Sequence, residues 1–293
     1  MNRRDILKSF PALAAAAQLS AQTASVTRTG QGRLRPGLVA YSYRGQLEAK
    51  KMSYEDLIRI TADLGFEGLD TTVYWFPDTS DAYLAGLRRT AHRNGISLYS
   101  VAVRVRLCQP TKELQDAEVE SAKKWVDVAQ KLGAGHVRVF GGTVPKGVSE
   151  AQAIAWAVEV MKPACAYAGT KGITLGIEDD GGLSTNAAPT IEIIKKTDSP
   201  WAGMNVDTGN FPKNGYEQTA MSIPYAVSTH IKPYVTDAEG KRQPADLDRL
   251  CNMFANGGYR GFVSLEYEEK DPDIGVPKLA PELIRATRKH SGV

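Results

Sequence analysis

Cysteine and histidine are scarce in this sequence, and neither sign of charge is in large excess. The chain has 293 residues, with three cysteines, four histidines and a formal net charge of +3. An odd set of three cysteines argues against a disulfide framework as the basis of stability. Cys165 and Cys251 fall on the apolar faces of expected helices, where a cysteine behaves as a small hydrophobe. The composition, 42% hydrophobic and 24% charged, is ordinary for a globular protein that buries an apolar core.

Long apolar runs are also missing. The first residues, "MNRRDILKSF" followed by "PALAAAAQLSAQTA", have a charged beginning, a short apolar stretch and a tail of small residues. A membrane-spanning helix needs about 20 apolar residues, more than this stretch offers. Arg3 and Arg4 lie side by side as in twin-arginine signals, which lead folded proteins across a bacterial inner membrane. We therefore expect residues 1–24 to be an export signal and the protein to be periplasmic, with an uncleaved anchor as the alternative.

The expected mature protein is close to neutral. The signal carries Arg3, Arg4, Lys8 and Asp5, so its removal lowers the formal charge from +3 to +1. A basic footprint for nucleic acid is then missing, and no membrane partner is expected after the signal is removed. No G-x-G-x-x-G follows the first expected strand, so a dinucleotide-binding fold has little support. These absences leave a small molecule as the expected partner, while self-association into a homo-oligomer stays open.

An alternation of apolar strands and amphipathic helices fills the chain after a polar linker at residues 25–36. Glycine recurs where a helix must stop and a strand must start, as in "LGFEG", "RNGIS" and "LGAGH". Such alternation predicts a parallel sheet covered by helices. Eight strands are expected, near Leu38–Tyr41, Gly68–Thr71, Ile96–Ala102, Val137–Phe140, Ile173–Glu178, Gly203–Asp207, Thr229–Lys232 and Phe262–Glu266. Their number and spacing predict a single-domain (β/α)8 TIM barrel over residues 37–293, with a doubly wound open sheet as the alternative.

The stretch "GITLGIEDDGG" ends an apolar strand in three adjacent carboxylates that resist burial together. Side chains alternate between the two faces of a barrel strand, and the outward ones must be apolar to meet the helices. Leu175 and Ile177 take the outward positions, so Glu178 faces the barrel interior. The same alternation in "GMNVDTGN", "VSTHIKP" and "FVSLEYEE" turns Asp207, His230 and Glu266 inward.

These four residues end four consecutive expected strands, on the face where barrel enzymes place their chemistry. Three carboxylates and one imidazole would repel one another in a water-poor barrel mouth unless a divalent cation joined them. Glu178, Asp207, His230 and Glu266 are therefore the expected metal ligands. An oxygen-rich set with one nitrogen suits Mn²⁺, which we expect first, with Co²⁺, Mg²⁺ and Zn²⁺ as alternatives. The remaining histidines are set aside, His136 because it lies at the other end of its strand.

The motifs "LGIEDDGG", "MNVDTGN", "THIKPY", "VSLEYE" and "VRVFGG" resemble those of the xylose isomerase-like barrels. That family contains sugar isomerases and epimerases, hydroxypyruvate isomerase, inosose dehydratases and endonuclease IV. In its sugar-converting members the matched positions hold one divalent metal, and the two glutamates also serve as acid and base. The resemblance thus implies that Glu178 and Glu266 are catalytic and that Asp207 and His230 are ligands.

Two departures from the family pattern bear on the chemistry. Asp179 and Asp180 stand where many relatives have Asn-His, and Asn210 stands where many have a second histidine. Endonuclease IV relatives use extra histidines for a trinuclear zinc cluster, and this chain has only four histidines in all. Together with the nearly neutral charge, this argues against a nuclease.

The expected reaction is proton transfer on a sugar. A metal can hold two adjacent oxygens of a keto-sugar, so that one glutamate removes a proton to give an enediolate and the other returns it. We expect an isomerase or epimerase acting on an unphosphorylated keto-sugar, since an exported enzyme meets free sugars. Two alternatives stay open: a 3-keto-glycoside lyase that eliminates the aglycone at the same metal site, and a non-catalytic sugar-binding module, which would not need two bases.

Several side chains are expected to contact the substrate. Lys232 and Arg138 have inward parity, the first as an oxyanion partner or in a salt bridge with Asp179 or Asp180, the second with an ion pair as its alternative. Aromatic residues after the first two strands are expected to form a sugar-stacking wall, and a long loop after the seventh strand carries an arginine. The full set of expected contacts is Lys232, Arg138, Asn210, Trp75, Tyr41, Arg242 and Asp180.

Overall fold

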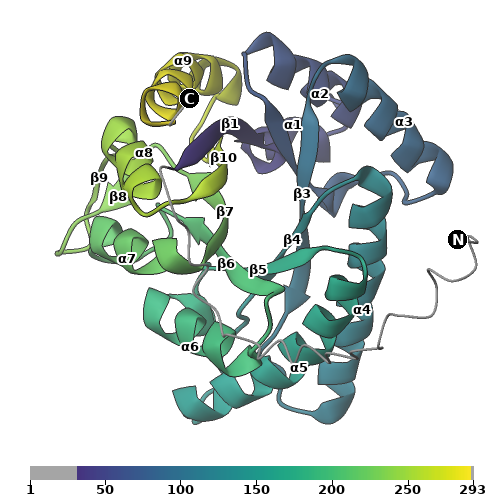
Figure 1. Cartoon of the computed structure of the whole chain (residues 1–293), viewed down its shortest axis with the longest axis vertical. Coiled ribbons are helices and arrows are strands. Elements are labelled where there is room, and N and C mark those ends of the chain that lie inside the picture. Colours follow the sequence, from purple (N-terminus) through teal and green to yellow (C-terminus); the bar gives the residue numbers. More distant parts are fainter. Residues whose placement is uncertain (1–31, 292–293) are drawn as a thin grey trace, which may run out of the picture.

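Eight parallel strands close into a ring in the computed structural model, which describes residues 32–291 (Figure 1). Around the ring the order is β1-β10-β7-β6-β5-β4-β3-β2, which confirms the predicted (β/α)8 barrel and excludes the open sheet. The barrel strands are β1 (Arg33–Val39), β2 (Gly68–Thr72), β3 (Ser97–Arg106), β4 (His136–Phe140), β5 (Thr174–Glu178), β6 (Ala202–Asp207), β7 (Ala226–Ile231) and β10 (Arg260–Leu265). A separate antiparallel hairpin, β8 (Tyr234–Thr236) and β9 (Arg242–Pro244), follows β7.

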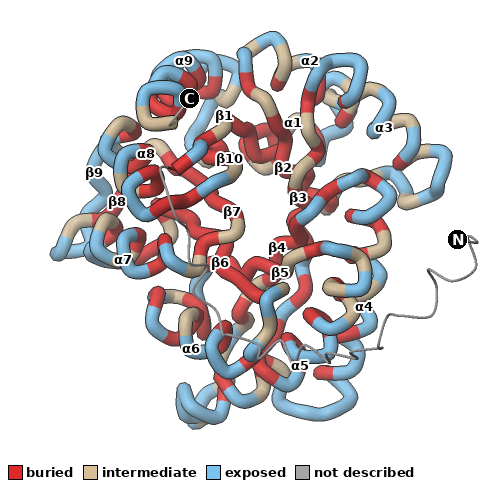
Figure 2. Tube along the Cα trace, viewed as in Figure 1, coloured by how far each residue is buried: buried red, intermediate tan, exposed pale blue. Residues whose placement is uncertain are grey.

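Helices surround the ring and bury its outer face, as the burial colours of Figure 2 show. The apolar side chains that alternate outward on the strands, such as Leu175 and Ile177, are fully buried beneath them. Cys165 and Cys251 are buried in helices, as expected of cysteines that serve as small hydrophobes. The helices are α1 (Arg44–Glu48), α2 (Tyr54–Asp63), α3 (Asp81–Arg93), α4 (Lys112–Leu132), α5 (Glu150–Thr170), α6 (Ala187–Thr197), α7 (Gly215–Ser222), α8 (Leu247–Asn256) and α9 (Pro272–His290). None of the helices in the described part of the chain is both long and apolar enough to cross a membrane.

The amino-terminal boundaries need one correction. Strand β1 begins at Arg33, so the last four residues of the expected linker, 33–36, belong to the barrel. They pair in parallel with β10, from Arg33 opposite Arg260 to Leu38 opposite Leu265, and so close the ring. The expected export signal, residues 1–24, lies outside the described residues.

His136 fills the interior of the barrel below its open end. It starts β4, is 5% exposed, and its Nδ1 lies 2.8 Å from the hydroxyl of Ser100 on β3. On the neighbouring strand β5, a Cβ at Gly176 would lie only 2.3 Å from Nε2 of His136. The imidazole therefore occupies the space that a side chain at residue 176 would otherwise take, and this histidine is a packing residue of the core.

Burial makes His136 a source of acid sensitivity. It lowers the pKa of His136 from its usual value of 6.5 to about 4, so the unfolded chain takes up a proton at a higher pH than the folded protein does. Between these two values the free energy of unfolding must fall as the pH falls. The contribution of this one group between pH 7 and pH 5 is about 2 kcal/mol. We expect His136→Gln to lose about that much less stability over the same interval in urea denaturation.

The exposed His92 on α3 provides the control, because His92→Gln should keep the wild-type pH dependence. Equal pH dependence of the wild type and His136→Gln would contradict the assignment of this sensitivity to the buried imidazole.

Candidate metal centre

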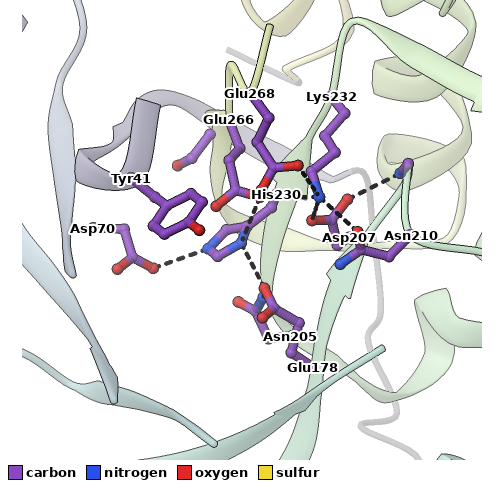
Figure 3. Close-up of polar contacts among 12 residues, drawn as sticks. Tyr41, Asp70, Glu178, Asn205, Asp207, Asn210, His230, Lys232, Glu266 and Glu268 are labelled. Carbon is purple, nitrogen blue, oxygen red and sulfur yellow. Dashed lines mark hydrogen bonds and ion pairs between the residues drawn. The ribbon is translucent and has the colours of Figure 1, made fainter. Parts of the chain in front are cut away.

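Four polar side chains converge where four neighbouring strands end. Glu178 ends β5, Asp207 ends β6, His230 lies near the end of β7, and Glu266 directly follows β10. All four are buried, and one ligand atom of each lies within 4.8 Å of those of the others. Figure 3 shows these side chains turned toward one another from their separate strands. All four side chains therefore point into the barrel, as the alternation along each strand predicted.

His230 is held in place at the centre of this cluster. Its Nε2 lies 3.1 Å from Oδ2 of Asp70 on β2, while its Nδ1 faces Glu178 Oε1 at 2.8 Å and Glu266 Oε2 at 3.7 Å. Burial opposes a charge on the ring, but Glu266, Asp70 and Glu178 together raise the pKa of His230 well above its usual value. The surroundings thus favour a positive charge at the point where the carboxylates meet.

The donor set fits a divalent cation. Nδ1 of His230 and Oδ2 of Asp207 are buried and have no hydrogen-bond partner within residues 32–291, although each lies within ion-pair distance of a neighbour. Both atoms thus rely on ion-pair neighbours alone, and each could also bind a cation placed among the four residues. Three carboxylates and one imidazole form an oxygen-rich set that suits Mn²⁺, Mg²⁺, Co²⁺ or Zn²⁺.

Glu178 is kept ionised by its neighbours. Its Oε1 accepts a hydrogen bond from the amide of Asn205 at 3.0 Å, and Nε of Arg138 lies 3.3 Å from its Oε2. Burial raises the pKa of Glu178, but Arg138 and His230 outweigh it and lower the pKa to about 2. The carboxylate is therefore available as a ligand or base over the whole neutral range.

Lys232 balances the acids on the other side of the cluster. Its Nζ lies 2.9 Å from Asp207 Oδ2 and 3.2 Å from Glu268 Oε2, and it donates to Oδ1 of Asn210 at 2.5 Å. These contacts replace the salt bridge with Asp179 or Asp180 that was the alternative from the sequence.

Asp179 has a supporting position behind the cluster. Its Oδ1 accepts the backbone N–H of Asp207 at 2.8 Å, which fixes the end of β6. Burial, with the nearby charge of Asp207, raises the pKa of Asp179 well above its usual value. Burial likewise raises the pKa of Asp207 to about 7, although Lys232 acts to lower it. Burial thus opposes ionisation of both aspartates, and a cation at the centre would favour the charged form of Asp207.

A cavity of about 180 Å³ opens above the four residues, and we call it the inner cavity. Five of the seven expected substrate contacts line it, namely Tyr41, Arg138, Asp180, Asn210 and Lys232. The other lining residues are Tyr74, Phe140, Glu178, Glu266 and Glu268.

The two remaining expected contacts do not line this cavity. Trp75 stacks on Tyr41, with ring centroids 5.8 Å apart, and so supports the wall from behind. Arg242 lies on the β8–β9 hairpin, where it bonds Glu269 at 3.1 Å and the hydroxyl of Tyr234 at 2.6 Å. The long loop predicted after the seventh strand is thus partly a hairpin, and its arginine contacts Glu269 and Tyr234, which do not line the inner cavity.

Asp70 and Glu268 also contact the four residues or their neighbours, although neither is among the residues predicted from the sequence. Asp70 follows the outward Leu69 in "GLDTT", so the alternation used for the other strands would have placed it inside the barrel. Glu268 follows Glu266 by two residues, and the same rule would have placed both on one side. Neither spacing reveals the partner, because the contacts join residues far apart in the chain.

The comparisons with known proteins agree with this geometry. Residues 58–290 match the sequence profile of the family described as Xylose isomerase-like TIM barrel, and the chain belongs to that family. A search among curated proteins finds no match.

Solved structures share the fold at low sequence identity. A xylose isomerase-like TIM barrel protein from Mycobacterium smegmatis in complex with magnesium has a TM-score of 0.71 and 19% identity, covering 88% of this chain and 98% of that one. A xylose isomerase domain protein from Planctomyces limnophilus has a TM-score of 0.70 and 15% identity, covering 89% and 99%. The D-psicose 3-epimerase of Clostridium cellulolyticum H10, solved with D-tagatose, has a TM-score of 0.68 and 17% identity, covering 88% and 98%.

Asp70 offers a test of the metal site that spares the four ligands. Asp70→Asn keeps the shape of the side chain but removes the charge that orients His230, and loss of such a partner weakens metal binding about 10- to 100-fold. We expect a rise of that size in the Kd for Mn²⁺, measured by titration calorimetry.

Asp248 provides a matched control, because it makes a similar contact with His290 Nε2 at 3.0 Å on the protein surface. Asp248→Asn should bind Mn²⁺ as the wild type does. An unchanged Kd in Asp70→Asn would show that this carboxylate does not position a ligand.

Proposed function

We propose that this protein is a divalent-metal-dependent isomerase or epimerase that acts on an unphosphorylated keto-sugar. The observation that carries the proposal is the placement of Glu178 and Glu266, which approach the same imidazole nitrogen from different strands at 2.8 Å and 3.7 Å. Two carboxylates on separate strands at the mouth of one small cavity suit an enzyme that removes a proton from a carbon and returns one to the same carbon or to its neighbour.

The chain's own groups supply the proton transfer. When bound, the cation would act as a Lewis acid on two neighbouring oxygens of the sugar. One glutamate, as the carboxylate, then accepts the proton of the adjacent C–H bond, whose electron pair enters the enediolate. The other glutamate, as the protonated carboxylic acid, returns a proton to carbon and is left as the carboxylate. Lys232 and Arg138 lie at the same cavity and can donate hydrogen bonds to oxygens that gain negative charge.

The relatives support this chemistry without fixing the substrate. One is named as a D-psicose 3-epimerase and was solved with D-tagatose, and another was solved with magnesium. We keep Mn²⁺ as the first metal to test, with Mg²⁺, Co²⁺ and Zn²⁺ beside it. We also keep the proposal that residues 1–24 direct the protein to the periplasm, where an unphosphorylated sugar is the natural substrate.

One structural observation favours a lyase acting on a 3-keto-glycoside as the second candidate. A further cavity of about 340 Å³ adjoins the inner one and shares four of its lining residues, Tyr41, Tyr74, Phe140 and Asp180. Such space would accommodate the aglycone of a glycoside, which the same enediolate would expel. A binding module without turnover has less support, because it would not need two glutamates so close together.

Exchange of carbon-bound hydrogen in D₂O tests the shared step of both reactions. Ketohexoses, including D-tagatose, would be incubated with the Mn²⁺-loaded enzyme and examined by NMR for deuterium at carbon. We expect Glu178→Gln and Glu266→Gln to lower the exchange rate by about 10²- to 10⁴-fold, the usual contribution of a general base.

Glu269→Gln is the control, since Glu269 pairs with Arg242 outside the cavity and should leave exchange unchanged. Melting temperatures would verify that all three variants fold. Exchange at the wild-type rate in both cavity variants would overturn the acid–base roles.

A further inference from the structure

The larger cavity beside the metal centre, here called the outer cavity, has walls of a different character. Besides the residues it shares with the inner cavity, it is lined by Arg104, Arg106, Gly142, Thr143 and Gly182. With volumes of about 340 Å³ and 180 Å³, the two cavities together offer room for more than one sugar ring. Nothing in the proposed proton transfer uses the two arginines.

The arginines are carried by an overhang of the barrel wall. Strand β3 has ten residues, whereas its neighbours β2 and β4 have five each, so its end extends beyond the ring. Val103 and Val105 are buried on the helix side, which leaves Arg104 and Arg106 on the cavity side of the same strand.

Backbone contacts hold this overhang in place. Arg106 pairs with Phe140, and the N–H groups of Leu107 and Cys108 donate to the carbonyls of Phe140 at 3.0 Å and Gly141 at 2.9 Å. Another part of the wall is backbone: a Cβ at Gly182 would lie 2.2 Å from the carbonyl oxygen of Gly142. The outer cavity is therefore formed by fixed elements on two sides.

Neither arginine forms a close ion pair, although Arg106 acts electrostatically on the half-buried Glu118. Within residues 32–291, no ion pair shorter than 4.0 Å involves Arg104 or Arg106. Arg104 instead lies over the ring of Tyr74, with its guanidinium carbon 4.1 Å from the centroid. Because the Tyr74 hydroxyl accepts a hydrogen bond from Arg138 at 3.0 Å, this stacking position is fixed relative to the metal centre.

The two cavities differ in the sign of their charge. Four carboxylates face two cations in the inner cavity, whereas Asp180 is the single carboxylate that lines the outer cavity, against two arginines. A bound divalent cation would bring the inner cavity close to neutral, whereas the outer cavity is net positive, so an anionic group is attracted to the outer cavity. A guanidinium suits a carboxylate or sulfate because it can donate two parallel hydrogen bonds.

We propose that the outer cavity binds an anionic sugar unit, so that the substrate is an acidic glycoside or disaccharide with its neutral ring in the inner cavity. The negative group is the carboxylate of a uronic acid or a sulfate ester, held by Arg104 and Arg106. The position of the neutral ring rests on the proposed function, whereas recognition of the anion does not.

An array of neutral oligosaccharides, each paired with its uronate and its 6-sulfate, would test this with the full-length Mn²⁺-loaded protein. We expect acidic members to bind at least about tenfold more tightly than their neutral counterparts, the size expected of hydrogen bonds to a charged group. Whichever of the two acidic arms binds more tightly identifies the group. Absence of an acidic preference, or of any binding, would overturn the proposal.

Variants then locate the preference on the protein. For the tightest acidic and neutral pair, titration calorimetry should show that Arg104→Gln and Arg106→Gln each lose most of the difference in Kd. Arg89→Gln is the matched control, since Arg89 is exposed on α3 and does not line the outer cavity. If both cavity variants, verified as folded by their melting temperatures, kept the full preference, the anion would bind elsewhere.

This result is independent of turnover. Failure of deuterium exchange would remove the proposed reaction while leaving an acidic preference intact, and loss of the preference would leave the exchange result standing.

Discussion

Repulsion among carboxylates at the open end of the barrel is offset by the charged residues around them. Glu178, Asp207 and Glu266 are buried within a few ångströms of one another, where water cannot screen them. The protein sets Arg138 on one side and Lys232 on the other, and joins His230 to Asp70 between them. Two buried ligand atoms still lack a hydrogen-bond partner within the described residues, and a divalent cation would complete the balance.

The barrel itself could be predicted because its pattern is local. Each strand alternates with a helix, and each outward side chain must be apolar. The number of strand–helix units and the alternation of side chains along each strand were therefore sufficient to predict the barrel. The β8–β9 hairpin escaped because strands of three residues, one of them ending in Pro244, show no periodic pattern. The full length of β3 could not be predicted because its pairing with β4 shifts register after Ala102, and that shift depends on the neighbouring strand.

The candidate site was predictable to the same depth. Parity placed Glu178 and His230 inside the barrel, but it could not say that Asp70 meets the far nitrogen of the imidazole, a contact across the ring. Nor could parity predict which carboxylate pairs with Lys232. Asp179 follows the ligand Glu178 directly in sequence, but its side chain accepts the backbone N–H of Asp207, and Lys232 pairs with the side chain of Asp207 instead. The side of the sheet to which a side chain points follows from the local sequence, whereas its contact partner depends on how the strands are arranged in the closed barrel.

Closure of that ring has a consequence for how the protein is made. The seam joins β1 to β10, with Leu38 opposite Leu265, and the last strand also delivers Glu266. Most of a nascent chain must therefore leave the ribosome before β1 and β10 can pair, and contacts between such distant positions form slowly. Until that pairing forms, the four residues of the candidate site are not brought together, so binding of a metal there would follow closure of the barrel.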